Sequence, residues 1–212
     1  MNVETKICGI TTSATLAACI DARADYCGFN FYSPSPRFLP LADAAKLSAQ
    51  AEGRITRVAL FVDADDAVIA ETLAAAKIDV LQLHGHETPA RLAEVKARFG
   101  LPVWKALPIA ASADVERAGA YRGLADLLLF DAKTPKGTLP GGMGLSFDWS
   151  LLSGQRVADV WGLAGGLSPD NVADAIRQTG TRMVDTSSGV ESAPGEKDIA
   201  KIAAFCRAAQ AV

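Results

Sequence analysis

The stretch Leu127-Leu128-Leu129-Phe130-Asp131 is an apolar run that ends in a carboxylate, and Lys6-Ile7-Cys8-Gly9-Ile10 carries a thiol at a similar point. Side chains alternate between the two faces of a strand, so Cys8 shares a face with Lys6, and Asp131 shares one with two of the leucines. If both segments are parallel strands of a closed barrel, the thiol and the carboxyl face each other across one mouth. This arrangement predicts a pair of residues that exchange protons with a substrate.

Outward from these two segments, short apolar runs alternate with longer Ala-rich stretches of helical character along the whole chain. The expected strands are residues 5–8, 26–31, 57–62, 80–83, 103–107, 127–130, 160–164 and 183–186. The expected helices are residues 13–24, 41–51, 65–77, 89–99, 113–121, 169–179 and 198–211, with a short one between the fifth and sixth of these starting near Trp149. The pattern predicts the α/β class and a single (β/α)8 TIM barrel over residues 1–212.

The beginnings of the helices support this assignment. Thr12 or Ser13 can cap the first helix, Thr88 the fourth, and Ser168, followed by a proline, the last but one. A doubly wound open sheet is the alternative architecture. Its dinucleotide-binding form is disfavoured because the first strand-to-helix turn, Cys8-Gly9-Ile10-Thr11-Thr12, lacks the glycine spacing G-x-G-x-x-G.

The composition and charge of the chain argue against nucleic acids and membranes as partners. The 212 residues are 50% hydrophobic, the formal net charge is -3, and the pI is about 5.4. Basic residues are scattered, so neither a nucleic acid nor an anionic membrane is an expected partner. The sequence shows no signal-peptide pattern and no apolar run of membrane-spanning length, so we expect a cytoplasmic protein.

Cysteine and histidine do not suggest a metal or a disulfide framework. The cysteines are Cys8, Cys19, Cys27 and Cys206, without paired spacing, and we expect reduced thiols. His84 and His86 form an H-x-H pair without an evident third ligand, so metal binding is not expected. His84 ends a strand and is either a hydrogen-bonding residue of the substrate-site wall or purely structural.

Two glycine-rich turns follow the seventh and eighth expected strands. They contain Gly165 and Gly166 in the first, and Ser187, Ser188 and Gly189 in the second. Glycine allows main-chain N–H groups to approach an anion closely, and serine hydroxyls add donors. Because these positions are the recurrent phosphate site of a TIM barrel, they predict a phosphate monoester as ligand.

These residues belong to a set of blocks that resembles phosphoribosylanthranilate isomerase over nearly the whole chain. The blocks are Lys6-Ile7-Cys8-Gly9-Ile10-Thr11, Gly28-Phe29-Asn30-Phe31 with Ser33-Pro34-Ser35-Pro36-Arg37, Gln82-Leu83-His84-Gly85-His86-Glu87, Gly141-Gly142-Met143-Gly144 with Phe147-Asp148-Trp149, Leu163-Ala164-Gly165-Gly166-Leu167 and Asp185-Thr186-Ser187-Ser188-Gly189-Val190-Glu191. Pro194-Gly195 and Lys197-Asp198 close the set.

The resemblance implies an enzyme of tryptophan biosynthesis. Its reaction is an Amadori rearrangement of N-(5-phosphoribosyl)anthranilate to 1-(o-carboxyphenylamino)-1-deoxyribulose 5-phosphate, without a metal or redox cofactor. In this resemblance Cys8 corresponds to the general base, Asp131 to the general acid, and Arg37 to a residue that contacts the anthranilate end of the ligand. Asp185 is expected to hold ribose hydroxyls. The partner is a small phosphosugar, and the chain is expected to be a monomer or homodimer.

The chemistry suits these residue types independently of the family. Ring opening needs a proton on the ring oxygen, which a carboxylic acid kept protonated by apolar neighbours such as Leu129 and Phe130 can deliver. The resulting iminium makes the proton on C2 acidic enough for a thiolate. A nearby cation favours that thiolate, and Lys6, which we also place among the substrate-binding residues, is one candidate.

The sequence departs from the family pattern at two positions. Met143 stands where the family usually has a small hydroxyl residue, and Thr186 replaces a more usual valine.

Two rival functions are considered. The first rival is a histidine-pathway isomerase, which resembles two half-barrels with aspartates at strands one and five; here strand five instead ends Lys105-Ala106-Leu107. The second is a non-catalytic barrel that has kept the phosphate site.

Overall fold

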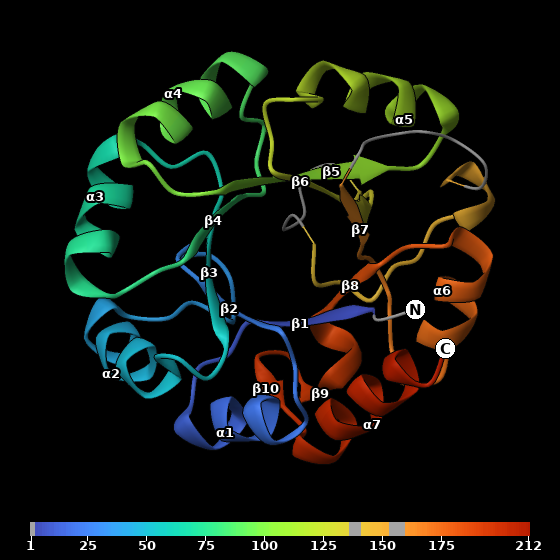
Figure 1. Cartoon of the computed structure of the whole chain (residues 1–212), viewed down its shortest axis with the longest axis horizontal. Coiled ribbons are helices and arrows are strands. Elements are labelled where there is room, and N and C mark those ends of the chain that lie inside the picture. The colour runs from blue at the N-terminus through green and yellow to red at the C-terminus, as the bar shows by residue number, and fades with distance from the viewer. Residues whose placement is uncertain (1–2, 136–140, 153–159) are drawn as a thin grey trace.

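The computed structural model describes residues 3–135, 141–152 and 160–212, and in it eight parallel strands close into a barrel. The barrel strands are β1 (Glu4–Cys8), β2 (Tyr26–Asn30), β3 (Thr56–Phe61), β4 (Val80–Leu83), β5 (Val103–Ile109), β6 (Leu127–Ala132), β7 (Trp161–Leu163) and β8 (Met183–Thr186). The helices around it are α1 (Ser13–Asp21), α2 (Leu41–Ala51), α3 (Asp66–Ala75), α4 (Pro89–Phe99), α5 (Ser112–Ala118), α6 (Val172–Thr179) and α7 (Ile199–Gln210). Short 3-10 segments are η1 (Gly119–Tyr121), η2 (Trp149–Leu152) and η3 (Ser188–Val190). Figure 1 shows the ring of helices around the strands.

The predicted (β/α)8 barrel is confirmed, and the strands lie where the apolar runs placed them, with shifts of one or two residues at their ends. The helices also lie where they were predicted, with shifts of up to three residues at their ends. The helix predicted to start at 169 starts at Val172, because residues 169–171 form a turn in which the Asn171 side chain accepts from the main-chain N–H of Ser168 and donates to the carbonyl of Gly166. The segment at Trp149 is the 3-10 turn η2, and residues 153–159 lie outside the described part.

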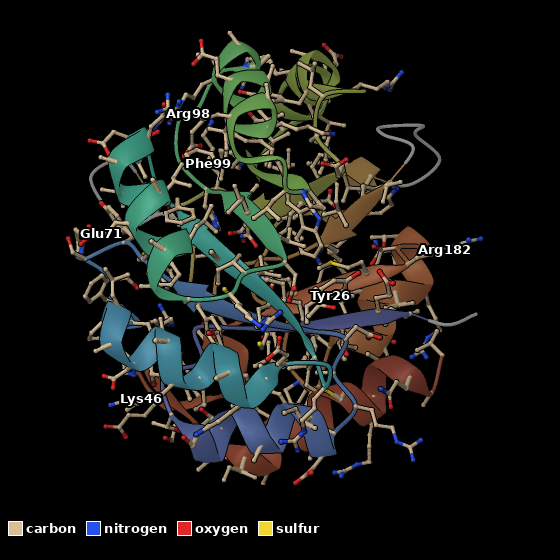
Figure 2. The ribbon with its side chains drawn as sticks, turned by 60° about the vertical axis from the view of Figure 1, so that its left-hand side comes forward. Tyr26, Lys46, Glu71, Arg98, Phe99 and Arg182 are labelled. Atoms are coloured by element: carbon tan, nitrogen blue, oxygen red, sulfur yellow. The ribbon has the colours of Figure 1, made fainter. Side chains whose placement is uncertain are left out.

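The strands separate two apolar cores. Alternate side chains point into the barrel and form a small cluster: Val58, Val80, Trp104, Ala106, Leu127, Leu129, Ala164 and Met183. Tyr26 packs against this cluster edge to face with Trp104, at 4.9 Å between ring centroids, and is seen within the barrel in Figure 2. The other face of the strands packs against the helices in a much larger cluster. Lys46, Glu71 and Arg98 lie on the outside of the helices (Figure 2). No helix in the described ranges is both long and apolar enough to span a membrane.

Carboxylates tie the amino-terminal ends of neighbouring strands together. Asp25, Asp79 and Asp126 each precede an even-numbered strand, and each accepts a main-chain N–H from the preceding odd-numbered strand at 2.7–2.8 Å. Asp79 also accepts hydrogen bonds from Nε and Nη2 of Arg57, both at 2.8 Å. These contacts lie at the end of the barrel opposite the cysteine and Asp131, so they serve the fold.

The barrel closes between its first and last strands. β1 pairs with β8 in a register that places Lys6 beside Asp185. After β8 the chain forms η3 and a short hairpin of β9 (Glu191–Ala193) and β10 (Glu196–Lys197), and α7 then starts with the Asp198 side chain capping its first turn. The hairpin therefore lies next to the mouth at the seam between the two ends of the barrel.

Candidate active site

One pocket opens at the carboxyl-terminal ends of the barrel strands. Its lining includes the predicted residues Cys8, Arg37, His84, Asp131, Gly165, Gly166, Asp185, Ser187 and Ser188. They come from β1, the turn after β2, and the ends of β4, β6, β7 and β8. Because parallel strands direct their carboxyl ends to one mouth, residues far apart in the sequence meet there. Gly189 and Lys6 are not part of this lining.

Lys6 is buried beside the pocket lining, and its place among the substrate-binding residues stays a prediction. Its side chain has no exposed surface, and its Nζ donates to Asp185 Oδ2 at 2.9 Å. Burial alone lowers the pKa of Lys6, but the charges of Asp185 and Cys8 outweigh it and raise that pKa. Burial raises the pKa of Cys8, whereas the ammonium groups of Lys6 and Lys197 act in the opposite direction and favour the thiolate.

The two carboxyl oxygens of Asp185 differ in their hydrogen bonding. Oδ2 receives the bond from Lys6, while Oδ1 is buried and has no hydrogen-bond partner among the residues that the structure describes. A buried unpaired carboxylate oxygen is costly unless a ligand supplies a donor. Since Asp185 lines the pocket, Oδ1 is the acceptor that the site offers to a hydroxyl group.

Asp131 is held at the end of β6 by its own strand and by β4. Oδ1 accepts the main-chain N–H of Ala132 at 2.8 Å, and Oδ2 lies 3.0 Å from His84 Nε2. The amide nitrogen of the fully buried Gln82 faces His84 Nδ1 at 3.3 Å, an arrangement that leaves Nε2 as the ring nitrogen directed at the carboxyl. Placed at the mouth beside Asp131, His84 fits the wall position that its place at a strand end suggested.

The two histidines of the H-x-H pair face different partners. His84 faces Asp131, whereas the His86 side chain is 98% exposed and lies 3.1 Å from Asp63 Oδ2. Within residues 3–135, 141–152 and 160–212 no group of three or more His, Cys, Asp or Glu side chains is placed to hold a metal ion.

Arg37 enters the pocket from the turn after β2 and is bound by a residue that the sequence did not single out. Its Nε and Nη2 groups donate to Glu191 Oε1 and Oε2, both at 2.7 Å, and Nη2 also donates to the carbonyl of Gly142 at 3.1 Å. The fork of donors expected for the anthranilate end is therefore already occupied on one side. No hydrogen bond of Nη1 is found among the residues that the structure describes.

The two glycine-rich turns are packed directly on each other. The Thr186 hydroxyl donates to the Leu167 carbonyl at 2.6 Å, and a Cβ at Gly189 would overlap the same oxygen. Gly165 has a φ of 87° and lies against the main chain of Ala132, so both its conformation and its surroundings require glycine. The unusual threonine thus joins the turn after β8 to the turn after β7.

Lys197 is a second residue that sequence reasoning missed. Its side chain is fully buried, and its Nζ contacts Glu191 Oε1 together with the carbonyl and the hydroxyl of Ser187, the latter two at 3.2 Å. The Ser187 hydroxyl in turn donates to the Cys8 carbonyl at 3.0 Å. The only signal in the sequence was the place of Lys197 in the last of the family blocks. Met143, the other departure from the family pattern, is exposed.

A closed (β/α)8 barrel with a thiol, carboxyl groups and an imidazole around one mouth, next to paired glycine-rich turns, belongs to the class of TIM-barrel enzymes that use acid–base chemistry. The model of a particular family, N-(5'phosphoribosyl)anthranilate (PRA) isomerase, matches residues 5–208. The chain belongs to this family.

Individual relatives agree along the whole chain. The N-(5'-phosphoribosyl)anthranilate isomerase of Paracoccus denitrificans is 53% identical over 100% of this chain and 99% of its own. A crystal structure of monomers of the dimeric enzyme from Thermotoga maritima has a TM-score of 0.86 at 34% identity, covering 99% of this chain and 100% of the other. A phosphoribosylanthranilate isomerase in complex with reduced 1-(o-carboxyphenylamino)-1-deoxyribulose 5-phosphate has a TM-score of 0.87 at 33% identity, with the same coverage. The predicted family, the isomerase class and the place in tryptophan biosynthesis are confirmed.

Proposed function

We propose that the mouth of this barrel carries out the Amadori rearrangement of N-(5-phosphoribosyl)anthranilate with Asp131 as general acid and Cys8 as general base. The observation that carries the proposal is the common pocket: a thiol at the end of β1 and a carboxyl at the end of β6 line it together, and both are buried. A substrate between these strands has one proton donor and one proton acceptor on opposite sides.

Asp131 acts first. Oδ1 accepts a main-chain N–H and Oδ2 faces His84, which also lines the pocket, so we assign the transferred proton to Oδ2. Protonation of the ribose ring oxygen accompanies cleavage of the C1–O bond, and the nitrogen lone pair forms the C1=N bond of an iminium. His84 orients the carboxyl during this step.

Cys8 acts second. Its thiolate removes the proton from C2, and the electrons of that C–H bond form a C1=C2 enolamine as the iminium is neutralised. The enolamine then tautomerises to the C2 ketone of the product. Because burial raises the pKa of Cys8, the thiolate depends on the neighbouring ammonium groups, of which Lys6 is the first.

The remaining groups bind the substrate. The turns containing Gly165, Gly166 and Ser187–Gly189 hold the phosphate, chiefly through main-chain N–H groups. The free Oδ1 of Asp185 accepts a ribose hydroxyl, which removes the cost of its unpaired state. The Arg37 guanidinium, which lines the pocket, meets the anthranilate end.

The test is a set of matched variants assayed by loss of substrate fluorescence. Cys8→Ser is expected to abolish measurable turnover, because a hydroxyl is a far weaker base than a thiol, whereas Cys27→Ser, a buried thiol on the neighbouring strand, is expected to retain it. Asp131→Asn is expected to lower kcat by roughly a hundredfold or more. Near-normal turnover of folded Cys8→Ser or Asp131→Asn would show that the base or the acid lies elsewhere. Absence of turnover in the unmodified protein would favour a barrel that only binds.

Arg37→Ala separates binding from proton transfer. We expect weaker inhibition by anthranilate, with inhibition by inorganic phosphate little changed, because the guanidinium stays charged throughout and only contacts one end of the ligand. An equal loss for both inhibitors would instead assign Arg37 a general structural role.

The same proposal includes a cytoplasmic location and a monomer or homodimer. Four free cysteines suit a reducing compartment. Sedimentation equilibrium distinguishes the two assembly states, of which the dimer is the one named for the Thermotoga maritima relative.

A further inference from the structure

Glu191 stands between two cations at the edge of the pocket. Its side chain is 4% exposed, it receives two bonds from Arg37 at 2.7 Å, and its Oε1 also contacts Lys197 Nζ. Burial opposes the charge on this carboxyl, but the hydrogen bonds from Arg37 and the charge of Lys197 outweigh it and hold its pKa below the usual range. Glu191 is therefore an ionised carboxylate shared by two side chains from different parts of the chain.

The first consequence concerns the direction of Arg37. A guanidinium has five N–H donors, and Glu191 together with the Gly142 carbonyl uses three of them. A bidentate carboxylate also fixes the plane of the group. Arg37 is thus held in one orientation, in which Nη1 has no hydrogen-bond partner within the described residues.

The second consequence concerns the phosphate turn. Lys197 is not in the pocket lining, yet its Nζ holds both the carbonyl and the hydroxyl of Ser187. Ser187 is the residue of the turn that also bonds to the main chain of Cys8. Lys197 therefore acts on the phosphate end through Ser187 and has no expected contact with substrate.

We propose that Glu191 and Lys197 form one positioning pair that joins Arg37 at the anthranilate end of the site to Ser187 at the phosphate end. The pair fixes the distance and orientation between the two groups that bind opposite ends of one substrate. Correct placement of both ends matters because an error of about 1 Å at the reacting atoms can cost on the order of a hundredfold in rate. This inference rests on the proposed assignment of the two ends.

Single variants test the two effects of the pair, on Arg37 and on Ser187. Glu191→Gln is expected to weaken inhibition by anthranilate about tenfold, the scale of one lost charge-assisted hydrogen bond, with a smaller loss for inorganic phosphate. Lys197→Met is expected to weaken inhibition by inorganic phosphate more than inhibition by anthranilate. The matched control is Lys201→Met, because the Lys201 ammonium donates to the main-chain carbonyl of Glu191 rather than to its carboxylate, and both affinities are expected to stay unchanged. If Lys197→Met and Lys201→Met behave alike, the proposal is overturned.

The double variant decides whether the two residues act as one pair. Since each single change breaks the same contact, the loss in kcat/KM of Glu191→Gln/Lys197→Met is expected to be smaller than the product of the two single losses. Multiplicative losses would show two independent residues and would refute the pair. The double variant still leaves the buried Arg37 guanidinium without its carboxylate partner, so circular dichroism checks that all three variants are folded before their kcat/KM values are compared.

Inhibitor affinities are measured by calorimetry on protein that is not turning over. They therefore report on the pair even if Cys8 proves not to be the base. Conversely, loss of activity in Cys8→Ser with unchanged inhibitor affinities leaves the pair intact, so failure of the proton-transfer assignment and failure of the pair give different results.

Discussion

Replacing Lys6 by Met is expected to destabilise the fold by about 3–5 kcal/mol, the cost of removing one partner from a buried ion pair. The magnitude follows from the position: the Lys6 side chain is 0% exposed, that of Asp185 is 8% exposed, and the atoms that form the pair are 2.9 Å apart. Asp185 Oδ1 already has no partner within the described residues, so loss of the ammonium leaves the whole carboxylate unpaired. Met is of similar length, so a new cavity adds little.

The same variant is expected to shift the pH dependence of turnover. Burial raises the pKa of Cys8, and Lys6 is the largest opposing influence, so without Lys6 that pKa rises further. A thiolate base becomes available only as pH approaches the thiol pKa. The rise of kcat/KM with pH is therefore expected at higher pH in Lys6→Met than in the unmodified enzyme.

Urea unfolding followed by circular dichroism, together with kcat/KM measured across pH, tests both statements. Lys6→Met/Asp185→Asn removes both charges and is expected to recover part of the lost stability. A Lys6→Met protein that is destabilised by less than about 1 kcal/mol would refute the argument from burial. A pH profile that does not move would show that Lys6 is not the cation that serves Cys8.

Three further changes test other contacts. Gly189→Ala is expected to weaken inhibition by inorganic phosphate and to cost about 1–3 kcal/mol, because the new Cβ overlaps the Leu167 carbonyl; an unchanged unfolding curve and phosphate affinity would contradict this. Thr186→Val removes the only side-chain donor to that carbonyl within the described residues and is expected to cost about 1–3 kcal/mol by urea unfolding, whereas a neutral result would mean that the hydroxyl does not stabilise the turn. Burial raises the pKa of Asp79, but hydrogen bonds from Arg57 outweigh it and lower the pKa, so its stabilisation is present above its unfolded pKa of about 3.9 and is lost as pH falls further. The stability deficit of Asp79→Ala is thus expected at neutral pH and should disappear in acid; a deficit independent of pH would refute the charge argument.

The fold was accessible from the sequence because each strand is a short apolar run and several helices have a local start signal. Thr12 and Thr88 cap α1 and α4 as expected, since a cap depends on residues only a few positions apart. The same rule failed at Ser168 and its following proline. There the Asn171 side chain bonds to Ser168 and to Gly166, and this side-chain competition delays α6 by three residues relative to the expected start at 169.

The pocket-lining residues could also be found, because the end of a strand indicates the mouth of a barrel. What the sequence could not show is which charged group meets which. Glu191 lies 154 positions from its partner Arg37, and no local spacing relates them. Lys6 was known to share a face with Cys8, but its burial beside the pocket lining and its bond to Asp185 depend on the register between β1 and β8.

The register between β1 and β8 also bears on how the chain folds as it is made. The strand pair that closes the barrel is also the one that carries the buried ion pair, with Lys6 and Asp185 179 positions apart, and Ser187 reaches Cys8 over the same separation. During synthesis Cys8 and Lys6 are made long before Asp185 and Ser187, the groups that they contact. The Cys8 thiol and the Lys6 ammonium therefore meet these partners only when β8 pairs with β1.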